Sequence, residues 1–223
     1  MKVLILIILA FEQQQLWDSA RMAYTKSSEL YLSLSDTLHF LDERYQAAGT
    51  YLSAMEYKKA DSAFSLTIDQ YQSEIQKHKL STFYLEKLTQ AVGRQQRFFE
   101  AYQVALKAYD SFDDNTPISL KSEVLAGLSS LTRLLGFYNE GLKYAYEYRN
   151  YAEDPLTESR ALNSIGLMHK RLKNKNEAVL YLKKCLALRR KHAPAWTPYI
   201  LNNLAELYNK VGPYDSALYW SNK

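Results

Sequence analysis

The sequence of 223 residues is poor in the residues that mark several protein classes. Its single cysteine, Cys185, excludes an internal disulfide and any cysteine-based metal cluster. Seven glycines and five prolines are few, and no segment is of low complexity. With 47% hydrophobic and 23% charged residues, the composition is that of a folded protein, not of a disordered one. The net charge of +4 is too small by itself to indicate a nucleic-acid ligand.

Motifs for catalysis, cofactors and metals are also missing. The chain has no Walker loop, no GxGxxG, no GxSxG and no HExxH. Its four histidines are scattered, and we interpret His169 and Cys185 as packed core residues. Acidic pairs such as Asp113-Asp114 and Glu153-Asp154 fall in expected connections, where we expect them to be solvated. We therefore predict a protein that is not an enzyme and that holds no cofactor and no metal.

Strand signals are almost absent. There is no Asn-Gly or Asp-Gly turn and no long alternating run of β-branched residues. Apolar residues recur instead at steps of three and four, which indicates helices throughout. The longest apolar run, Val3 to Phe11, is far shorter than the roughly 20 residues that a membrane-spanning helix needs. We expect no transmembrane span in this chain.

A repeat organises the helical pattern. The segment LNNLAELYNKVGPYDSALYW places a small residue and a tyrosine on one helix, a glycine in the turn, and an alanine on the next helix. Related segments recur every 37 to 41 residues back along the chain. A small residue marks the same position in each repeat, where two helices can approach closely: Ala20, Ala60, Ala101, Gly141, Ala178 and Ala217.

These segments resemble the tetratricopeptide repeat. The usual repeat has 34 residues and a closing proline, so the present repeats are longer and depart from it at the end. The longer spacing is similar to that of kinesin light chains and of the sensor arms of bacterial signalling proteins. The resemblance covers residues 16–223 and implies an all-α fold, an α-α superhelix of about five antiparallel helix pairs and a partial sixth.

The beginning and the end of the chain each support a separate prediction. Residues 1–15 contain MKVLILIILAF, which has the lysine and apolar stretch of an export signal but no good cleavage site. The alternative is the first helix of a leading repeat, since Leu4, Ile7, Ile8 and Phe11 fit that register. The signal favours an exported or envelope-associated protein, and the helix a cytoplasmic one. At the other end the last repeat is truncated after Ala217, which favours a fragment of a longer protein.

The resemblance also implies a binding surface. In such repeats the first helix of each pair lines a concave groove, and asparagine side chains there can hold an extended peptide backbone. Arginine adds recognition of carboxylates through paired donors. The predicted groove residues are Arg94, Arg133, Arg160, Asn163, Lys170, Arg171, Asn202 and Asn203.

A concentration of positive charge overlaps this surface. From Lys170 to His192 there are nine Lys or Arg residues against one acid, Glu177. This run is either a solvated cationic face or a patch for an acidic partner; nucleic acid is not expected, because no aromatic residues are interleaved for base stacking.

These features predict a protein-interaction array, the sensing or docking arm of a larger bacterial signalling protein that binds a peptide or extended segment. The alternatives are the repeat domain of a peptide-responsive cytoplasmic transcription regulator and a dimerising structural scaffold. The partner is a protein or peptide, acidic in one interpretation, and a homodimer is compatible with the sequence.

Overall fold

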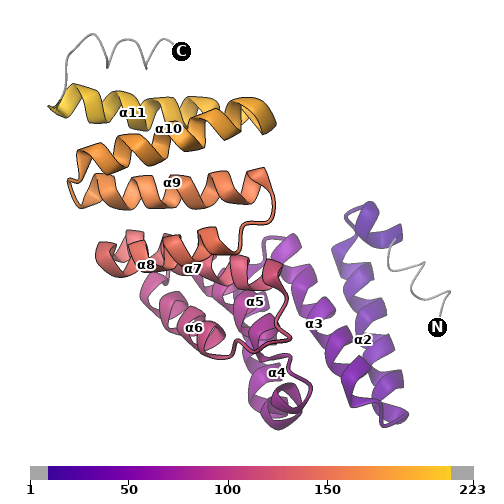
Figure 1. Ribbon diagram of the computed structural model, residues 1–223. Helices are drawn as coiled ribbons and strands as arrows, with labels where there is room; N and C mark the ends of the chain where they lie inside the picture. The colour runs from indigo at the N-terminus through magenta and orange to yellow at the C-terminus, as the bar shows by residue number, and fades with distance from the viewer. Residues whose placement is uncertain (1–9, 212–223) are drawn as a thin grey trace. The chain divides into compact units, whose positions relative to one another are not determined.

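The structure is a computed structural model that describes residues 10–211 (Figure 1). Over these residues every regular element is a helix and no strand is present. The helices fall into two compact units, Met1–Asp114 and Asn115–Lys223. Consecutive helices pack against each other in antiparallel pairs within each unit. The predicted all-α class, a solenoid of helix pairs, is therefore confirmed.

The first unit is a run of helices in which each packs against its neighbours in the chain. They are α2 (Trp17–Ser33), α3 (Thr37–Ser53), α4 (Tyr57–Lys77), α5 (Ser81–Arg94) and α6 (Phe98–Asp110). Phe64 and Tyr84 are the largest side chains that this unit buries completely. The buried Tyr84 hydroxyl donates a hydrogen bond to the carbonyl of Leu41 at 2.6 Å, so the polar end of the ring is satisfied inside the core.

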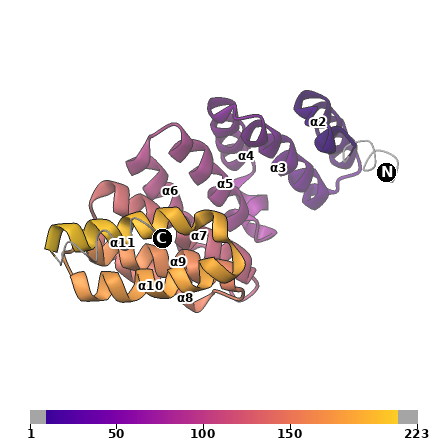
Figure 2. The same cartoon turned by 90° about the horizontal axis from the view of Figure 1, so that it is seen from above.

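The second unit continues the same pattern. It contains α7 (Ile118–Leu135), α8 (Tyr138–Asn150), α9 (Pro155–Arg171), α10 (Lys175–His192), the short η1 (Pro194–Trp196) and α11 (Thr197–Val211). Figures 1 and 2 show α9, α10 and α11 following α7 and α8 as successive layers. Leu162, Leu182, Cys185 and Leu204 form part of one buried cluster between the last three layers. The prediction that Cys185 is a packed residue is confirmed.

One turn geometry joins the two helices of every described pair. The residue five positions before each small-residue anchor has a left-handed backbone, at Gln15 (φ 56°), Met55 (61°), Gln96 (63°), Gly136 (85°) and Lys173 (64°). The next N–H then reaches back to the carbonyl five residues earlier, as in Phe137 to Thr132 at 2.8 Å, which caps the first helix. The predicted left-handed cap at Gly136 is confirmed, while Gly212 lies outside the described residues. Four of these five turns use a side-chain-bearing residue where glycine would be less strained.

The anchors are small because the helices of a pair touch there. Ala20, Ala60, Ala101 and Ala178 are fully buried. A Cβ on Gly141 would overlap the side chains of both Met168 and Thr132. The sequence interpretation of these positions as crossing points is therefore correct over the described residues, and Ala217 lies outside them.

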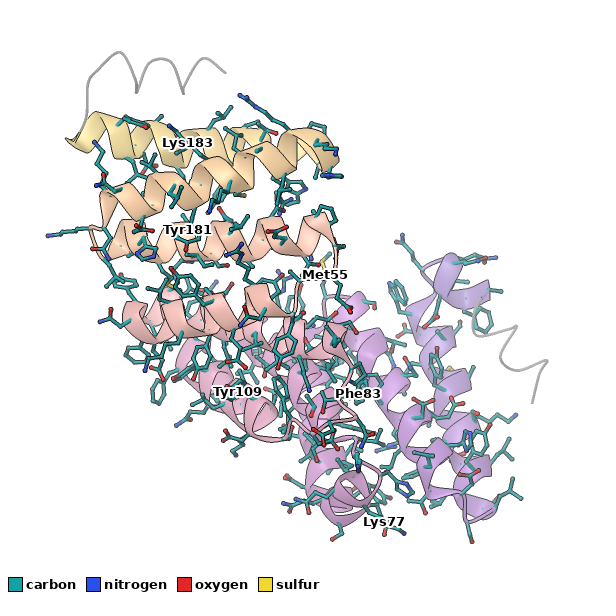
Figure 3. All side chains as sticks on the ribbon, viewed as in Figure 1. Met55, Lys77, Phe83, Tyr109, Tyr181 and Lys183 are labelled. Carbon is teal, nitrogen blue, oxygen red and sulfur yellow. The ribbon has the colours of Figure 1, made fainter. Side chains whose placement is uncertain are left out.

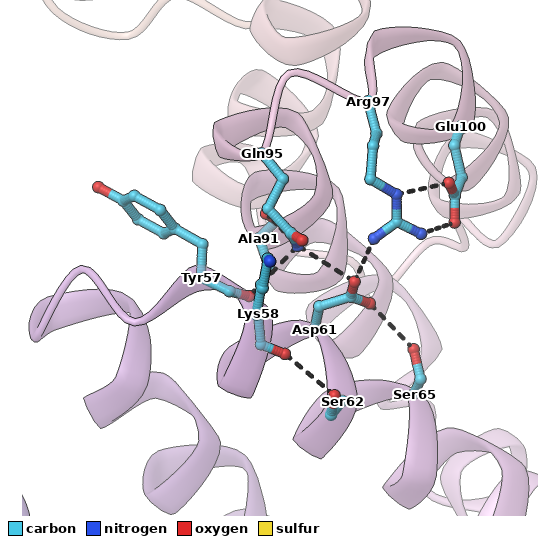
Figure 4. A network of polar contacts seen from close by, with 9 residues as sticks. All are labelled: Tyr57, Lys58, Asp61, Ser62, Ser65, Ala91, Gln95, Arg97 and Glu100. Atoms are coloured by element: carbon cyan, nitrogen blue, oxygen red, sulfur yellow. Dashed lines mark hydrogen bonds and ion pairs between the residues drawn. The ribbon is translucent and has the colours of Figure 1, made fainter.

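A polar network fastens α4 to the α5–α6 turn in the first unit (Figure 4). Arg97, just before α6, pairs with Asp61 on α4 and also with Glu100 in the first turn of α6, where its Nε donates to Oε2 at 2.8 Å. Gln95, on the other side of the left-handed residue, donates to Asp61 Oδ2 at 3.1 Å. Both residues that flank the turn thus hold the same carboxylate, which fixes the turn against the preceding pair.

The start of the chain is described only from residue 10. Residues 10–13 are helical, and Gln15 has the same left-handed turn as the later pairs. The Tyr24 hydroxyl on α2 donates to the Glu12 carboxylate at 3.0 Å. The apolar residues 1–9 lie outside the described part of the chain, so the choice between an export signal and a leading repeat helix stays a prediction. The truncation after Ala217 also lies outside it.

Candidate functional site

The predicted groove residues do not form a single site. Arg94 lies at the end of α5 in the first unit, whereas the other seven belong to the second unit. Those seven lie on α7, α9 and α11. Six of them divide between two hollows, and Asn202 lines neither. Arg133, Lys170, Arg171 and Asn203 line one hollow, and Arg160 and Asn163 line another.

The first hollow, which we call the cationic groove, has a volume of about 580 Å³. It is lined by Arg133, Leu167, Lys170, Arg171, Lys173, Lys175, Tyr199, Asn203, Glu206 and Leu207. Five of these side chains are cations and one is an acid, while two leucines and a tyrosine supply apolar surface. A groove of this size and composition suits a ligand that carries several negative charges and an apolar group.

A hydrogen-bond network organises the α11 side of the groove. Lys170 Nζ donates to Asn203 Oδ1 at 2.7 Å and to Glu206 Oε2 at 2.9 Å. Asn202 Nδ2 donates to the other Glu206 oxygen at 3.0 Å. Asn203 Nδ2 donates to the carbonyl of Tyr199 at 3.0 Å, one turn earlier on α11. The network holds α9 and α11 together. Its carboxylate acceptor is Glu206, so these donors already have a negatively charged partner within the protein.

The two asparagines differ in their surroundings. Asn203 is only 6% exposed and already uses its amide nitrogen and oxygen within the network. Asn202 is exposed and makes one hydrogen bond, to Glu206. Asn202 is therefore available for a ligand, whereas Asn203 serves the packing of α11.

The cations on the other side of the groove have no acidic partner among the described residues. Arg133, Arg171 and Lys173 form no ion pair with any carboxylate of residues 10–211. The Lys175 ammonium lies 5.3 Å from the centre of the Tyr208 ring. Like charges gathered in a groove raise its positive potential, because little neutralises them locally.

The second hollow, which we call the polar pocket, lies at the opposite ends of α7 and α9. Its volume is about 420 Å³. It is lined by Ser119, Ser122, Glu123, Ala126, Ser130, Tyr148, Tyr151, Glu153, Asp154, Thr157, Arg160, Asn163, Ser164 and Arg189. Hydroxyls and charges of both signs dominate this lining, so it differs from the cationic groove in chemistry.

His169 has no free nitrogen for a ligand, as its interpretation as a packed residue requires. It is 7% exposed and stacks on Tyr181, which Figure 3 labels, with ring centres 5.7 Å apart. Its ring nitrogens face the Tyr146 hydroxyl at 3.2 Å and Asn174 Nδ2 at 3.3 Å. Burial lowers the pKa of His169, and burial raises the pKa of the Cys185 thiol to about 11. A buried, apolar environment favours the uncharged forms, a neutral imidazole and a protonated thiol.

Among the described residues, no group of three or more His, Cys, Asp or Glu side chains could hold a metal ion. Over the same residues no helix is both long and apolar enough to cross a membrane.

Residues 159–193, which cover most of α9 and all of α10, match the family model of the tetratricopeptide repeat. This is a tetratricopeptide-repeat fold. The resemblance stated from the sequence is thereby confirmed. No curated protein matches the chain.

Solved structures share this tetratricopeptide-repeat fold at low sequence identity. BtubC (BKLC) from P. vanneervenii has a TM-score of 0.73 and 17% identity, over 92% of this chain and 88% of that one. A STAND signal-transduction ATPase with a tetratricopeptide repeat sensor, PH0952 from Pyrococcus horikoshii, has a TM-score of 0.81 and 15% identity, over 98% of this chain. MamA has a TM-score of 0.63 and 18% identity, over 86% of this chain and 93% of that one. The chain spans only 34% of the STAND protein, so the likeness concerns one part of that protein.

In this tetratricopeptide-repeat fold Arg189 is buried, which its sequence context did not predict. The sequence assigned it to the cationic run, yet it is 8% exposed and its guanidinium lies 5.8 Å from the Trp196 ring. A signal was present, because Ala178, Leu182, Cys185 and Arg189 follow one another at steps of four, three and four along the buried stripe of α10. Arg189 therefore does not belong to a solvated face.

Proposed function

We propose that this chain is a protein-interaction array whose cationic groove binds an acidic, extended segment of a partner protein. The observation that carries the proposal is the charge balance of the groove, where, among the described residues, five cations surround apolar surface and face a single carboxylate, Glu206. Four of the five cations, all but Lys170, have no acidic partner among the described residues, so a partner's carboxylates would meet donors that are free to bind them.

The chemistry of the lining indicates how such a segment would bind. Arg133 on α7 and Arg171 on α9 can each hold a carboxylate through two parallel N–H donors. Leu167 and Leu207 offer an apolar surface for a leucine or aromatic side chain between the acids. Beside the lining, the exposed amide of Asn202, which contacts Glu206, can both donate to and accept from the main chain of the segment.

A titration with two peptides tests this proposal. One labelled peptide alternates Asp or Glu with leucine, and the matched control replaces every acid by Asn or Gln. We expect the acidic peptide to bind by fluorescence anisotropy, more weakly as salt rises, and the neutral peptide not to bind. Equal binding of the two peptides would refute the charge-based proposal.

Two matched variants locate the binding. Arg171→Ala removes a groove cation and should weaken binding by about fivefold, which corresponds to about 1 kcal/mol. Lys191→Ala removes an exposed cation of α10 that does not line the groove, so it should leave the affinity unchanged. If both variants weaken binding equally, the interaction is a general effect of net charge and not a property of the groove.

We further propose that the array is the docking arm of a larger bacterial signalling protein. The STAND protein offers a precedent, because its description joins a tetratricopeptide repeat sensor to a signal-transduction ATPase. The gene sequence beyond the codon for Lys223 tests this part. A kinase or ATPase module there would support it, whereas a DNA-binding module or an immediate stop codon would contradict it.

A further inference from the structure

The polar pocket contains a buried positive charge that lacks a counter-ion. Arg189 is 8% exposed, yet no carboxylate of residues 10–211 forms an ion pair with it. Its Nε–H is covered from water and has no hydrogen-bond partner. Around the guanidinium lie the Trp196 ring at 5.8 Å and the Cys185 sulfur. Burying a charge without a partner is costly, so a buried arginine that lines a pocket indicates an anion as the missing partner.

The same pocket also offers one unpaired acceptor, on Asn163. Asn163 Oδ1 is buried and accepts no hydrogen bond from the described residues. Asn163 is part exposed as a whole, and the torsion that orients its amide has a broad range, so the oxygen can turn toward a ligand. Glu123 and Glu153 line the pocket as further negative groups. The unpaired Asn163 oxygen calls for a donor, preferably a cationic one near these carboxylates, beside the anion that Arg189 requires.

The remaining lining limits the size and polarity of the ligand. Arg160 reaches the pocket from α9, where it is exposed and lies beside the Tyr148 hydroxyl. Five hydroxyl side chains of serine and threonine surround the hollow, and the aliphatic surface comes from Ala126. A volume of about 420 Å³ with this lining fits a small polar molecule better than an apolar one.

We propose that the polar pocket binds a small zwitterionic ligand of the amino-acid class. Its carboxylate lies against Arg189 and Arg160, and its ammonium group donates to Asn163 Oδ1 and faces Glu123. This site is distinct from the cationic groove, because the two hollows share no lining residue. The proposal does not depend on whether the groove binds an acidic segment.

Titration of the full chain with small probes tests the ligand class. The probes are glycine, L-serine and L-glutamate, with acetate as a carboxylate without an ammonium group and methylamine as an ammonium group without a carboxylate. Binding is followed by shifts in the ¹H–¹⁵N NMR spectrum. We expect at least one amino acid to bind about tenfold or more tightly than acetate and methylamine. Acetate that binds as tightly as every amino acid would overturn the zwitterion, and no binding of any probe would overturn the site.

Two variants locate the site and separate it from a structural role. Asn163→Leu removes the unpaired acceptor at similar volume, so we expect binding to weaken about 10- to 100-fold while Tm stays equal or rises. Arg189→Lys keeps the charge but has no Nε–H and no planar fork, and should weaken binding by a similar factor. Lys191→Ala is the control on the same helix. Amino-acid affinity that is unchanged in both Asn163→Leu and Arg189→Lys would place the ligand elsewhere and refute the assignment.

The acidic-peptide titration keeps the two proposals apart. Asn163→Leu should bind the acidic peptide as the unmodified chain does, because Asn163 does not line the cationic groove. Loss of amino-acid binding with normal peptide binding confirms two independent sites. Simultaneous loss of both would contradict their independence.

Discussion

Among the described residues, Glu206 is the one acid that lines the cationic groove, and replacing it should raise the affinity for an acidic segment. Its two carboxylate oxygens accept hydrogen bonds from Lys170 at 2.9 Å and from Asn202 at 3.0 Å. Glu206 thus occupies two donors that a partner's carboxylate could use, and it repels that carboxylate. The substitution Glu206→Gln removes the charge while it keeps an oxygen that can accept from Asn202.

The size of the effect follows from distance and exposure. Two like charges about 4 Å apart repel by about 1 kcal/mol in bulk water and by about 4 kcal/mol at an effective dielectric constant near 20. The Glu206 side chain is 45% exposed, which places the repulsion near the lower value. We therefore expect Glu206→Gln to bind the acidic peptide about fivefold more tightly. The lost ion pair with Lys170 should lower the stability of the protein by less than about 1 kcal/mol.

Anisotropy titrations at low and moderate salt measure this change. Glu140→Gln is the matched control, since Glu140 is an exposed acid in the first turn of α8 and lines neither hollow. The advantage of Glu206→Gln should shrink as salt rises, because the repulsion is screened. An affinity that is unchanged or weaker, or an equal gain in Glu140→Gln, would show that Glu206 does not compete with the ligand.

Three further predictions concern stability, and urea unfolding measures each. Gly136→Ala should lower the free energy of unfolding by about 1 kcal/mol, because alanine is strained at φ 85°. Met55→Gly should raise it by roughly 0.5 kcal/mol, because glycine relieves the left-handed backbone at φ 61°. Changes of the same sign in both variants would refute this account of the turns. Asn203→Ala should lower the free energy of unfolding by about 1 to 3 kcal/mol, because it leaves buried hydrogen-bond partners unpaired, while Asn202→Ala should lower it much less. Similar losses of stability in the two variants would contradict the roles assigned to them. Burial lowers the pKa of His169 below its ordinary value of 6.5, so the unfolded chain binds more protons and stability should fall as the pH drops below about 6.5. His169→Gln should lack this part of the pH dependence, and an unchanged pH profile in that variant would refute it.

The helices and their repeat were predictable from the sequence. Small residues recur every 37 to 41 positions because two helices can cross closely only where side chains are small, and this constraint is local to each pair. The same register placed Cys185 and His169 in the core, and it placed a left-handed cap at Gly136. Sequence propensity did not predict the left-handed backbone at Met55, Gln96 and Lys173. At those turns the packing of the two helices decides the conformation, since a local preference of about 1 kcal/mol is outweighed by burial.

Which side chains meet across repeats was decided only by the tertiary structure. The periodicity of α11 shows which face is buried, but the contact of Asn203 with Lys170 depends on how α11 stacks on α9. The same stacking brings Arg133 and Arg171 into one groove and leaves Arg94 in the other unit. Arg189 is the clearest case. Its charge predicts an exposed side chain, whereas its place on the buried face of α10 makes it a buried one. The sequence by itself determined a tetratricopeptide-like stack of helices, since periodicity and small-residue spacing are local. The tertiary structure decided where the stack presents charge, because that depends on side chains that lie tens of residues apart in the chain.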